Sequence, residues 1–323
     1  MEIFKGNKTY DFMSKSKIFI IISMVLILGS WGLLATKGLN YGIDFAGGTI
    51  VQVKYKGEAP ISDIRQRVTS NKEFAGAIVT EFGAKEEVII RIPTTTTSVG
   101  NDTGDTIKTL LTGSGDFEIR RVDMVGPKVG NELREKGLMA MLLSIIGILI
   151  YISLRFEWRF AVASIFALVH DVSIALGMLV LFGVDVNLDI LAALLTILGY
   201  SLNDTIIVFD RIREGIKDSK IYDLFQIINE SVTNTLSRTT LTSLTTFFVV
   251  VTLYFFGGEI INGFSFTMLI GVVVGTYSSI FVASPFLKWL GFDVEAFKKK
   301  EAQKEKLRIE KEKMRAQYEG GVV

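Results

Sequence analysis

Six long apolar runs constrain the fold of this chain more than any other feature of its sequence. They occupy residues 18–35, 137–154, 160–182, 188–209, 239–256 and 264–287. A helix of about 18 or more apolar residues is long enough to cross the roughly 30 Å hydrocarbon layer of a membrane. The mean hydropathy of +0.41 is also high for a soluble protein of this length. The sequence therefore predicts a polytopic α-helical membrane protein with six transmembrane helices.

The first run, 18–35, resembles a signal peptide because Lys15 and Lys17 precede it. It is longer than the apolar core of about 7–15 residues that is usual in signal peptides. The following TKGLN stretch offers no pair of small residues spaced for cleavage. We therefore expect residues 18–35 to remain as the first transmembrane helix.

The placement of basic residues predicts how the helices are oriented. The loops 184–189 and 257–263 carry acidic residues and neither Lys nor Arg. Basic residues instead flank the other ends of the spans: Lys5, Lys8, Lys15, Lys17, Arg155, Arg159, Arg211, Arg213, Lys217, Lys220, Arg238, Lys288, Lys298, Lys299 and Lys300. Lys and Arg favour cytoplasmic flanks. We therefore expect a multi-pass protein of the cell (inner) membrane whose N-terminal residues 1–17 and C-terminal residues 291–323 are both cytoplasmic.

The polar segment 36–136 is then extracytoplasmic and is long enough for one small domain. GGTIVQVKY, AIVTEF, EEVIIRI and DFEIRRVDMV are rich in strand-forming residues, while 60–71 and 106–111 favour helices. The polar stretch TTTTSVGNDTGD, 94–105, is predicted to be a loop. The order β-α-β-β-α-β is typical of a ferredoxin-like sandwich. We therefore predict an α+β ferredoxin-like domain with its linker over 36–136, followed by a five-helix membrane bundle over 137–290.

The C-terminal tail, 291–323, is rich in Lys and Glu. It is predicted to be a solvated helix or an end without fixed structure. Contact with anionic lipid or with ribosomal RNA is the less favoured alternative, so we expect membrane lipid but no nucleic acid among the partners.

Ionisable and amide side chains inside the predicted spans are the candidate functional residues. They are Asn203 and Asp204 in the fourth span, His170 and Asp171 in the third, and Arg238 where the fifth begins. A charge at the centre of a membrane helix costs about 2.5–3.5 kcal/mol by insertion scales, so such residues face a protein interior or a wet cavity.

Two interpretations of Asp204 are open from the sequence. In the first, Asp204 and Arg238 form a buried pair that fixes helix packing, although desolvation leaves such a pair little net stability. In the second, Asp204 loads and releases a proton, and a movement of Arg238 controls its charge. A proton that moves down 100 mV supplies about 2.3 kcal/mol. The same alternatives apply to Asp171, and His170 is either a hydrogen-bonded core residue or a proton carrier.

Several classes of function lack their motifs. The chain has no Cys, which excludes disulfides and thiolate metal sites. It has one His, no H-E-x-x-H and no G-x-x-x-x-G-K-[ST], so neither a metalloprotease nor an ATP site is indicated. We expect no catalytic residues, no metal and no cofactor, and therefore not an enzyme.

Five stretches carry a family resemblance. They are YGIDFAGGTIVQV (41–53), VGPKVGNEL (125–133), HDV (170–172), GYSLNDTIIVFDRIRE (199–214) and SRTTLTS (237–243). Together they resemble the SecF family, the smaller membrane subunit of the SecD–SecF accessory complex of the bacterial Sec export machinery.

The resemblance implies membership of the RND superfamily of proton-driven transporters, in which six spans make half of a bundle and SecD supplies the other half. It implies that the proton gradient helps to move unfolded secretory polypeptides out of the SecYEG channel. Asp204 and Arg238 match the family residues that are linked to proton passage. A structural assembly subunit without proton conduction is the alternative, and an RND-type small-molecule exporter is less favoured because the chain has one half-bundle and one small domain.

Overall fold

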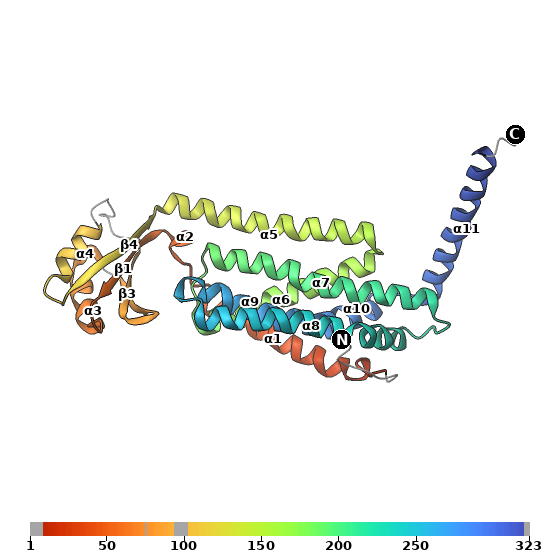
Figure 1. Cartoon of the computed structure of the whole chain (residues 1–323), viewed down its shortest axis with the longest axis horizontal. Coiled ribbons are helices and arrows are strands. Elements are labelled where there is room, and N and C mark those ends of the chain that lie inside the picture. The colour runs from red at the N-terminus through yellow and green to blue at the C-terminus, as the bar shows by residue number, and fades with distance from the viewer. Residues whose placement is uncertain (1–8, 75, 94–102, 320–323) are drawn as a thin grey trace.

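The computed structural model describes residues 9–74, 76–93 and 103–319. Three parts follow one another along its long axis (Figure 1). A sheet domain lies at one end and a bundle of long helices lies in the middle. The C-terminal helix α11 (Val294–Glu319) projects from the other end, where α1 also begins. Most of the predicted loop 94–105 lies outside the described residues, since α4 begins at Thr103.

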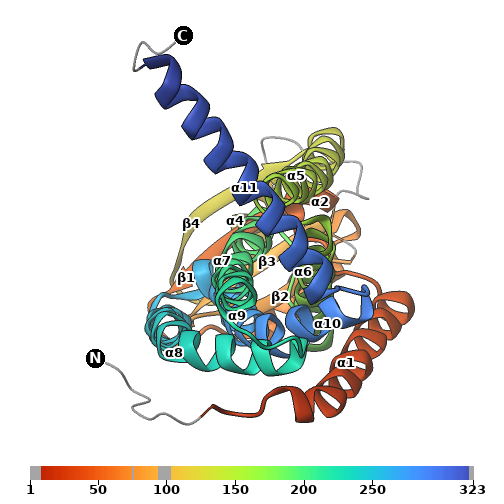
Figure 2. The same cartoon turned by 90° about the vertical axis from the view of Figure 1, so that its right-hand side faces the viewer.

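Six helices of the described chain are long and apolar enough to cross a membrane, which confirms the predicted class. They are α1 (Ser16–Lys37), α5 (Pro127–Arg155), α6 (Trp158–Phe182), α7 (Leu188–Asp218), α8 (Leu224–Phe256) and α9 (Glu259–Ser278). A π-helical turn, Ser279–Ala283, and the short α10 (Ser284–Trp289) continue α9. Viewed along the bundle, α6, α7 and α9 lie near its centre and α1 lies at its edge (Figure 2).

Two of these helices begin well before the predicted spans. Helix α5 begins at Pro127, because proline suits the first turn of a helix, where its missing N–H is not needed. Helix α8 begins after Asp223, whose Oδ1 accepts a hydrogen bond from the Phe225 N–H at 3.2 Å. Mostly polar residues follow both starts, at 128–136 in α5 and at 229–238 in α8, so the long apolar run begins later in each helix.

Glycines allow the central helices to approach closely. A Cβ on Gly271 of α9 would lie 2.2 Å from Cγ1 of Ile197 on α7, and one on Gly275 would lie 2.9 Å from Cβ of Ser201. Small residues are the usual means by which membrane helices bring their backbones together. This close contact brings the hydroxyl groups of α7 and α9 within reach of the same acidic side chains.

The sheet domain contains β1 (Gly48–Tyr55), α3 (Ile61–Ser70), β2 (Ile78–Phe82), β3 (Ala84–Pro93), α4 (Thr103–Leu111) and β4 (Phe117–Val125). The strand order is β2-β3-β1-β4, and all neighbouring strands are antiparallel. Ile64 and Val68 of α3 and Ile107 and Leu111 of α4 are fully buried in the core of this domain. This confirms the predicted ferredoxin-like β-α-β-β-α-β arrangement.

Two adjacent glycines connect this domain to the bundle. Gly47 and Gly48 follow the short helix α2 (Ile43–Ala46) and have φ of 75° and 145°, which side chains rarely tolerate. A Cβ on Gly48 would lie 2.7 Å from the Ile92 carbonyl oxygen, and one on Gly47 would lie 3.0 Å from Cα of Pro127. Glycines therefore let β1 begin directly against the first turn of α5.

Polar contacts hold the sheet domain against the loop between α6 and α7. Arg91 of β3 forms an ion pair with Asp185 of this loop at 2.5 Å. Asp44 accepts a hydrogen bond from the Leu188 N–H at 3.0 Å. The domain therefore contacts the bundle through side chains as well as through its two covalent links.

Candidate functional site

Helix α7 places Asp204 inside the bundle and Asn203 on its outside. Asp204 is only 2% exposed, whereas Asn203 is exposed. Successive residues of a helix point about 100° apart, so the two neighbours separate onto different faces. Thr205 and Ser201 share the buried side with Asp204. The polar pair predicted from the sequence is thus one interior carboxylate and one outward-facing amide.

A short chain of hydroxyl groups leads to the Asp204 carboxylate. Ser243 of α8 donates a hydrogen bond to Asp204 Oδ2 at 3.2 Å, and Thr276 of α9 donates to Ser243 Oγ at 2.7 Å. Within the described part of the chain, no second hydrogen bond reaches Asp204. Thr239 lies one turn before Ser243, and its buried Oγ1 has no hydrogen-bond partner among the described residues. Three helices thus converge on a carboxylate with unused acceptor capacity.

Arg238 lies at an open groove of about 520 Å³ rather than inside the bundle. Asn203, Asp210 and Asn234 also line this groove. Both Asp204 and Arg238 belong to the described chain, and neither an ion pair nor a hydrogen bond joins them. Side chains three or four residues apart share a helix face, but Arg238 precedes Ser243 by five and turns outward. The structure therefore places both residues at the α7–α8 contact without forming the buried pair that was one of our two interpretations.

A second buried cluster surrounds Asp171 of α6, which has 0% exposure. His170 Nδ1 lies 2.7 Å from Asp171 Oδ1. Ser278 of α9 donates to Asp171 Oδ2 at 2.8 Å, and Ser201 of α7 donates to the same oxygen. Both oxygens of this carboxylate are therefore engaged.

His170 extends this cluster to α1. Its Nε2 lies 3.0 Å from Ser23 Oγ, and Ser23 Oγ lies 2.9 Å from the hydroxyl oxygen of Tyr277 on α9. The chain of contacts from Asp171 thus joins α1, α6, α7 and α9. This arrangement supports the interpretation of His170 as a hydrogen-bonded core residue.

The two clusters use the same pair of helices. On α7, Ser201 contacts Asp171 and lies three residues before Asp204. On α9, Thr276 belongs to the Asp204 chain and Ser278 contacts Asp171. A shift of α9 against α7 would therefore alter the hydrogen bonds of both carboxylates.

Sequence reasoning missed the hydroxyl partners, namely Ser23, Ser201, Ser243, Thr276, Tyr277 and Ser278. Ser and Thr are common in membrane helices, where many donate only to a carbonyl of their own helix. Thr246 and Thr252 of α8 do so, to Thr242 and Phe248. Only the relative placement of the helices distinguishes hydroxyl groups that reach a buried acidic cluster from those that donate within their own helix. Across the described ranges, no cluster of three or more His, Asp or Glu side chains could hold a metal ion.

Comparisons with known proteins identify the family of this chain. The family described as "Protein export membrane protein SecD/SecF, C-terminal" matches residues 106–293, and the "SecD/SecF GG Motif" matches 32–59, which contains Gly47 and Gly48. The protein translocase subunit SecF of Helicobacter pylori J99 is 50% identical over 323 residues, which is 100% of both chains. The SecF subunit of Vibrio alginolyticus is 44% identical over 94% of this chain and 97% of its own.

Two solved SecDF structures are also similar to this chain. The crystal structure of SecDF, a translocon-associated membrane protein from Thermus thermophilus, is similar with a TM-score of 0.80 and 34% sequence identity. The match covers 88% of this chain but 39% of that one. A second SecDF structure, in a super-membrane-facing form, has a TM-score of 0.67 and 33% identity, with 94% of this chain and 41% of that chain covered. This chain thus spans about two fifths of those SecDF chains.

Proposed function

Because the chain belongs to the SecF family of protein translocase subunits, we propose that it works with SecD to couple proton flow to polypeptide export through SecYEG. The observation that carries this proposal is the placement of Asp204. It is a buried carboxylate with one hydrogen bond from the protein, and the adjacent residue, Asn203, lines a groove together with the exposed cation Arg238.

The hydrogen bond from Ser243 gives the proton a defined place. When Asp204 is charged, its Oδ2 accepts from Ser243, and Thr276 in turn donates to Ser243. When Asp204 takes up a proton, it becomes a donor, and the hydroxyl chain can reverse direction. Loss of the negative charge also removes the attraction on Arg238. Each proton that moves down 100 mV supplies about 2.3 kcal/mol for the movement that follows.

SecD is the partner that would close the groove. Asn203 and Arg238 are exposed on the outer surface of α7 and α8, near the middle of two helices that are apolar enough to span a membrane. Polar side chains facing hydrocarbon are costly, so such a surface calls for a protein or aqueous neighbour. The SecDF chains are more than twice as long as this one, and we propose that a separate SecD chain supplies the remaining half-bundle.

We propose that both termini are cytoplasmic, in the inner (cytoplasmic) membrane. The beginning of α1 and helix α11 lie together at the end opposite the sheet domain (Figure 1). The basic flanks favour that end as the cytoplasmic one. The sheet domain is then outside, where it would hold and release an emerging unfolded polypeptide.

The alternative, a purely structural subunit, draws its support from the Asp171 cluster. That carboxylate has three hydrogen-bond partners and joins four helices through its contacts. We assign this packing role to Asp171 and His170, and we keep the proton-carrying role for Asp204.

The test is the substitution Asp204→Asn in the complex with SecD. Asn preserves size and one acceptor but cannot be charged, so we expect assembly with SecD to persist and gradient-dependent export of a secreted precursor to be lost. Asp218→Asn is the matched control, because Asp218 lies at the exposed end of the same helix and does not line the groove. Unchanged export by the Asp204→Asn complex would refute the coupling role.

A further inference from the structure

The hydrogen bonds around His170, the one histidine of the chain, determine where its protons lie. Tyr277 of α9 donates its hydroxyl proton to the Phe19 carbonyl oxygen at 2.5 Å. The same Tyr277 oxygen lies 2.9 Å from Ser23 Oγ on α1. Because a phenol has one proton, which is already donated, Tyr277 is the acceptor in this second contact. The hydroxyl proton of Ser23 therefore points toward Tyr277.

Ser23 then has no proton left for His170. Its Oγ lies 3.0 Å from His170 Nε2, so this contact is a hydrogen bond only if Nε2 carries a proton and donates it. The order Asp171, His170, Ser23 is that of an acyl-transfer triad, in which the serine would instead donate to the histidine. The contact with Tyr277 reverses that direction. The network therefore protonates Nε2 instead of preparing Ser23 as a nucleophile.

The other ring nitrogen is protonated as well. His170 Nδ1 lies 2.7 Å from Asp171 Oδ1, and a nitrogen and a carboxyl oxygen this close share a proton in a hydrogen bond. Ser201 and Ser278 donate to Asp171 Oδ2, and hydrogen bonds to a carboxylate favour its charged form. The shared proton is then on Nδ1, and the ring is an imidazolium.

The charge balance of the bundle supports this assignment independently. Among the ion pairs of the described residues, Asp171 takes part only in the one with His170, and both side chains are completely buried. A single charge inside the membrane is costly, whereas a carboxylate beside an imidazolium has no net charge. Asp171 and Tyr277 are the titratable neighbours of the ring, the latter with its ring centre 6.1 Å away. The contacts from α1 and α7 are the neutral hydroxyls of Ser23 and Ser201.

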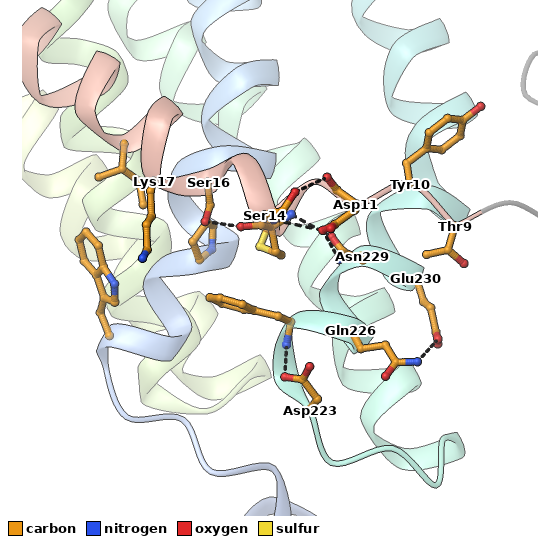
Figure 3. A pocket seen from close by; sticks show the side chains of 15 residues that line it. Thr9, Tyr10, Asp11, Ser14, Ser16, Lys17, Asp223, Gln226, Asn229 and Glu230 are labelled. Carbon is orange, nitrogen blue, oxygen red and sulfur yellow. Dashed lines mark hydrogen bonds between the residues drawn. The ribbon is translucent and has the colours of Figure 1, made fainter.

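His170 and Asp204 are reached from different openings of the bundle. A cavity of about 580 Å³ lies where α1, α8 and α10 meet, with Lys17 on its α1 wall (Figure 3). Ile20 and Trp289 line both this cavity and a narrow crevice that reaches His170. The crevice has a volume of about 20 Å³, room for about one water molecule. His170 does not line the groove of about 520 Å³ at α7 and α8, so solvent reaches the two sites by separate routes.

We propose that His170 and Asp171 form an imidazolium–carboxylate pair that keeps a resident proton at neutral pH. Ser23 and Asp171 hold the two N–H groups of the ring, and the pair stays neutral as a whole. Its proton takes no part in transport, which leaves Asp204 as the buried carboxylate of the two that changes its charge. The pair is a property of the folded chain and does not rest on the proposed coupling function.

Nitrogen NMR of the full-length chain, labelled with ¹⁵N-histidine, tests this pair. The one histidine gives one set of ring resonances when the chain is purified through a tag without histidine and reconstituted in nanodiscs. At about pH 8 an ordinary imidazole, whose pKa is about 6.5, is almost entirely neutral and has one bare nitrogen. We expect instead two ring nitrogens that each carry a hydrogen. A bare nitrogen at this pH would overturn the proposal.

The substitution Tyr277→Phe tests the direction of the hydrogen bonds. Without the phenol oxygen, the Ser23 proton can turn toward Nε2 and compete with the imidazolium. The ring should then hold its proton about tenfold less tightly, so the midpoint of deprotonation should fall by about one pH unit. Tyr151→Phe is the matched control, because Tyr151 is exposed on the outside of α5, and it should leave the midpoint unchanged.

The substitution Asp204→Asn separates this inference from the coupling role. It should leave the ring resonances of His170 unchanged, whatever its effect on export. Equal midpoints for the Tyr277→Phe chain and the unaltered chain would overturn the assigned direction of the hydrogen bonds. A midpoint that moves with Asp204→Asn would show that the proton of His170 is not independent of the coupling site.

Discussion

The two buried carboxylates of the bundle differ in how completely the protein satisfies them. Asp171 contacts His170, Ser201 and Ser278, and both of its oxygens are engaged. Asp204 accepts one hydrogen bond, from Ser243, and lies close to a groove that contains Arg238. Both are almost fully buried, so burial alone does not separate them.

This difference indicates which group can change its charge. A carboxylate with three hydrogen-bond partners loses several interactions when its protonation changes. The folded structure therefore favours one protonation state of that carboxylate. A carboxylate with one hydroxyl partner can accept or donate through that hydroxyl, because a hydroxyl group does both. We therefore expect substitutions at Asp171 to affect stability and substitutions at Asp204 to affect coupling.

The largest effect is expected from Asp171→Leu. This substitution leaves three buried polar partners without their acceptor, at roughly 1 kcal/mol or more each, so the free energy of unfolding should fall by about 3 kcal/mol. Asp204→Leu removes one hydrogen bond and also one desolvated charge, and should change the free energy of unfolding by about 0.5 kcal/mol or less. Unfolding of each purified variant in detergent measures these two changes. Equal losses in the two variants would contradict the division between the carboxylates.

An intermediate effect is expected from the hydroxyl chain at Asp204. Ser243→Ala removes a hydrogen bond to a carboxylate, worth about 1.5 kcal/mol, so gradient-dependent export should fall about tenfold. Thr276→Val removes a bond between neutral groups and should have a smaller effect, about threefold. Thr246→Val is the control, since that hydroxyl donates only to the Thr242 carbonyl of its own helix. If export by the Thr246→Val control fell by a similar factor, the hydrogen bonds from Thr276 and Ser243 would have no specific role in export.

The sequence predicts the class of the fold because apolar length and strand alternation are local signals. The six spans and the order of strands around 47–125 follow directly from such patterns. The carboxylates were also visible, because a charge inside an apolar run is rare. Their different surroundings were not, because Ser201 and Ser278 reach Asp171 only through the close contact of α7 with Gly271 and Gly275. Likewise, the outward direction of Arg238 depends on which face of α8 packs against α7, and this packing is not a local signal in the sequence.

The smallest effect concerns a carboxylate outside the membrane, Glu301 of α11, which provides a reference for the two buried ones. Lys217 at the end of α7 pairs with Glu301 at 2.5 Å, and this hydrogen bond, with a second from Lys304, holds the pKa of Glu301 below its ordinary value. Because the pKa is lower when folded, the pair stabilises α11 at neutral pH and the contribution is lost as pH falls through that lowered pKa. A partly exposed pair is worth about 0.5 kcal/mol, so amide exchange in the first turns of α11 should rise slightly, about twofold, on acidification.

Glu301→Gln should abolish this pH dependence of amide exchange, whereas Glu310→Gln further along α11 should preserve it. A pH response of the Glu301→Gln chain equal to that of the unaltered chain would show that this ion pair does not hold α11 in place.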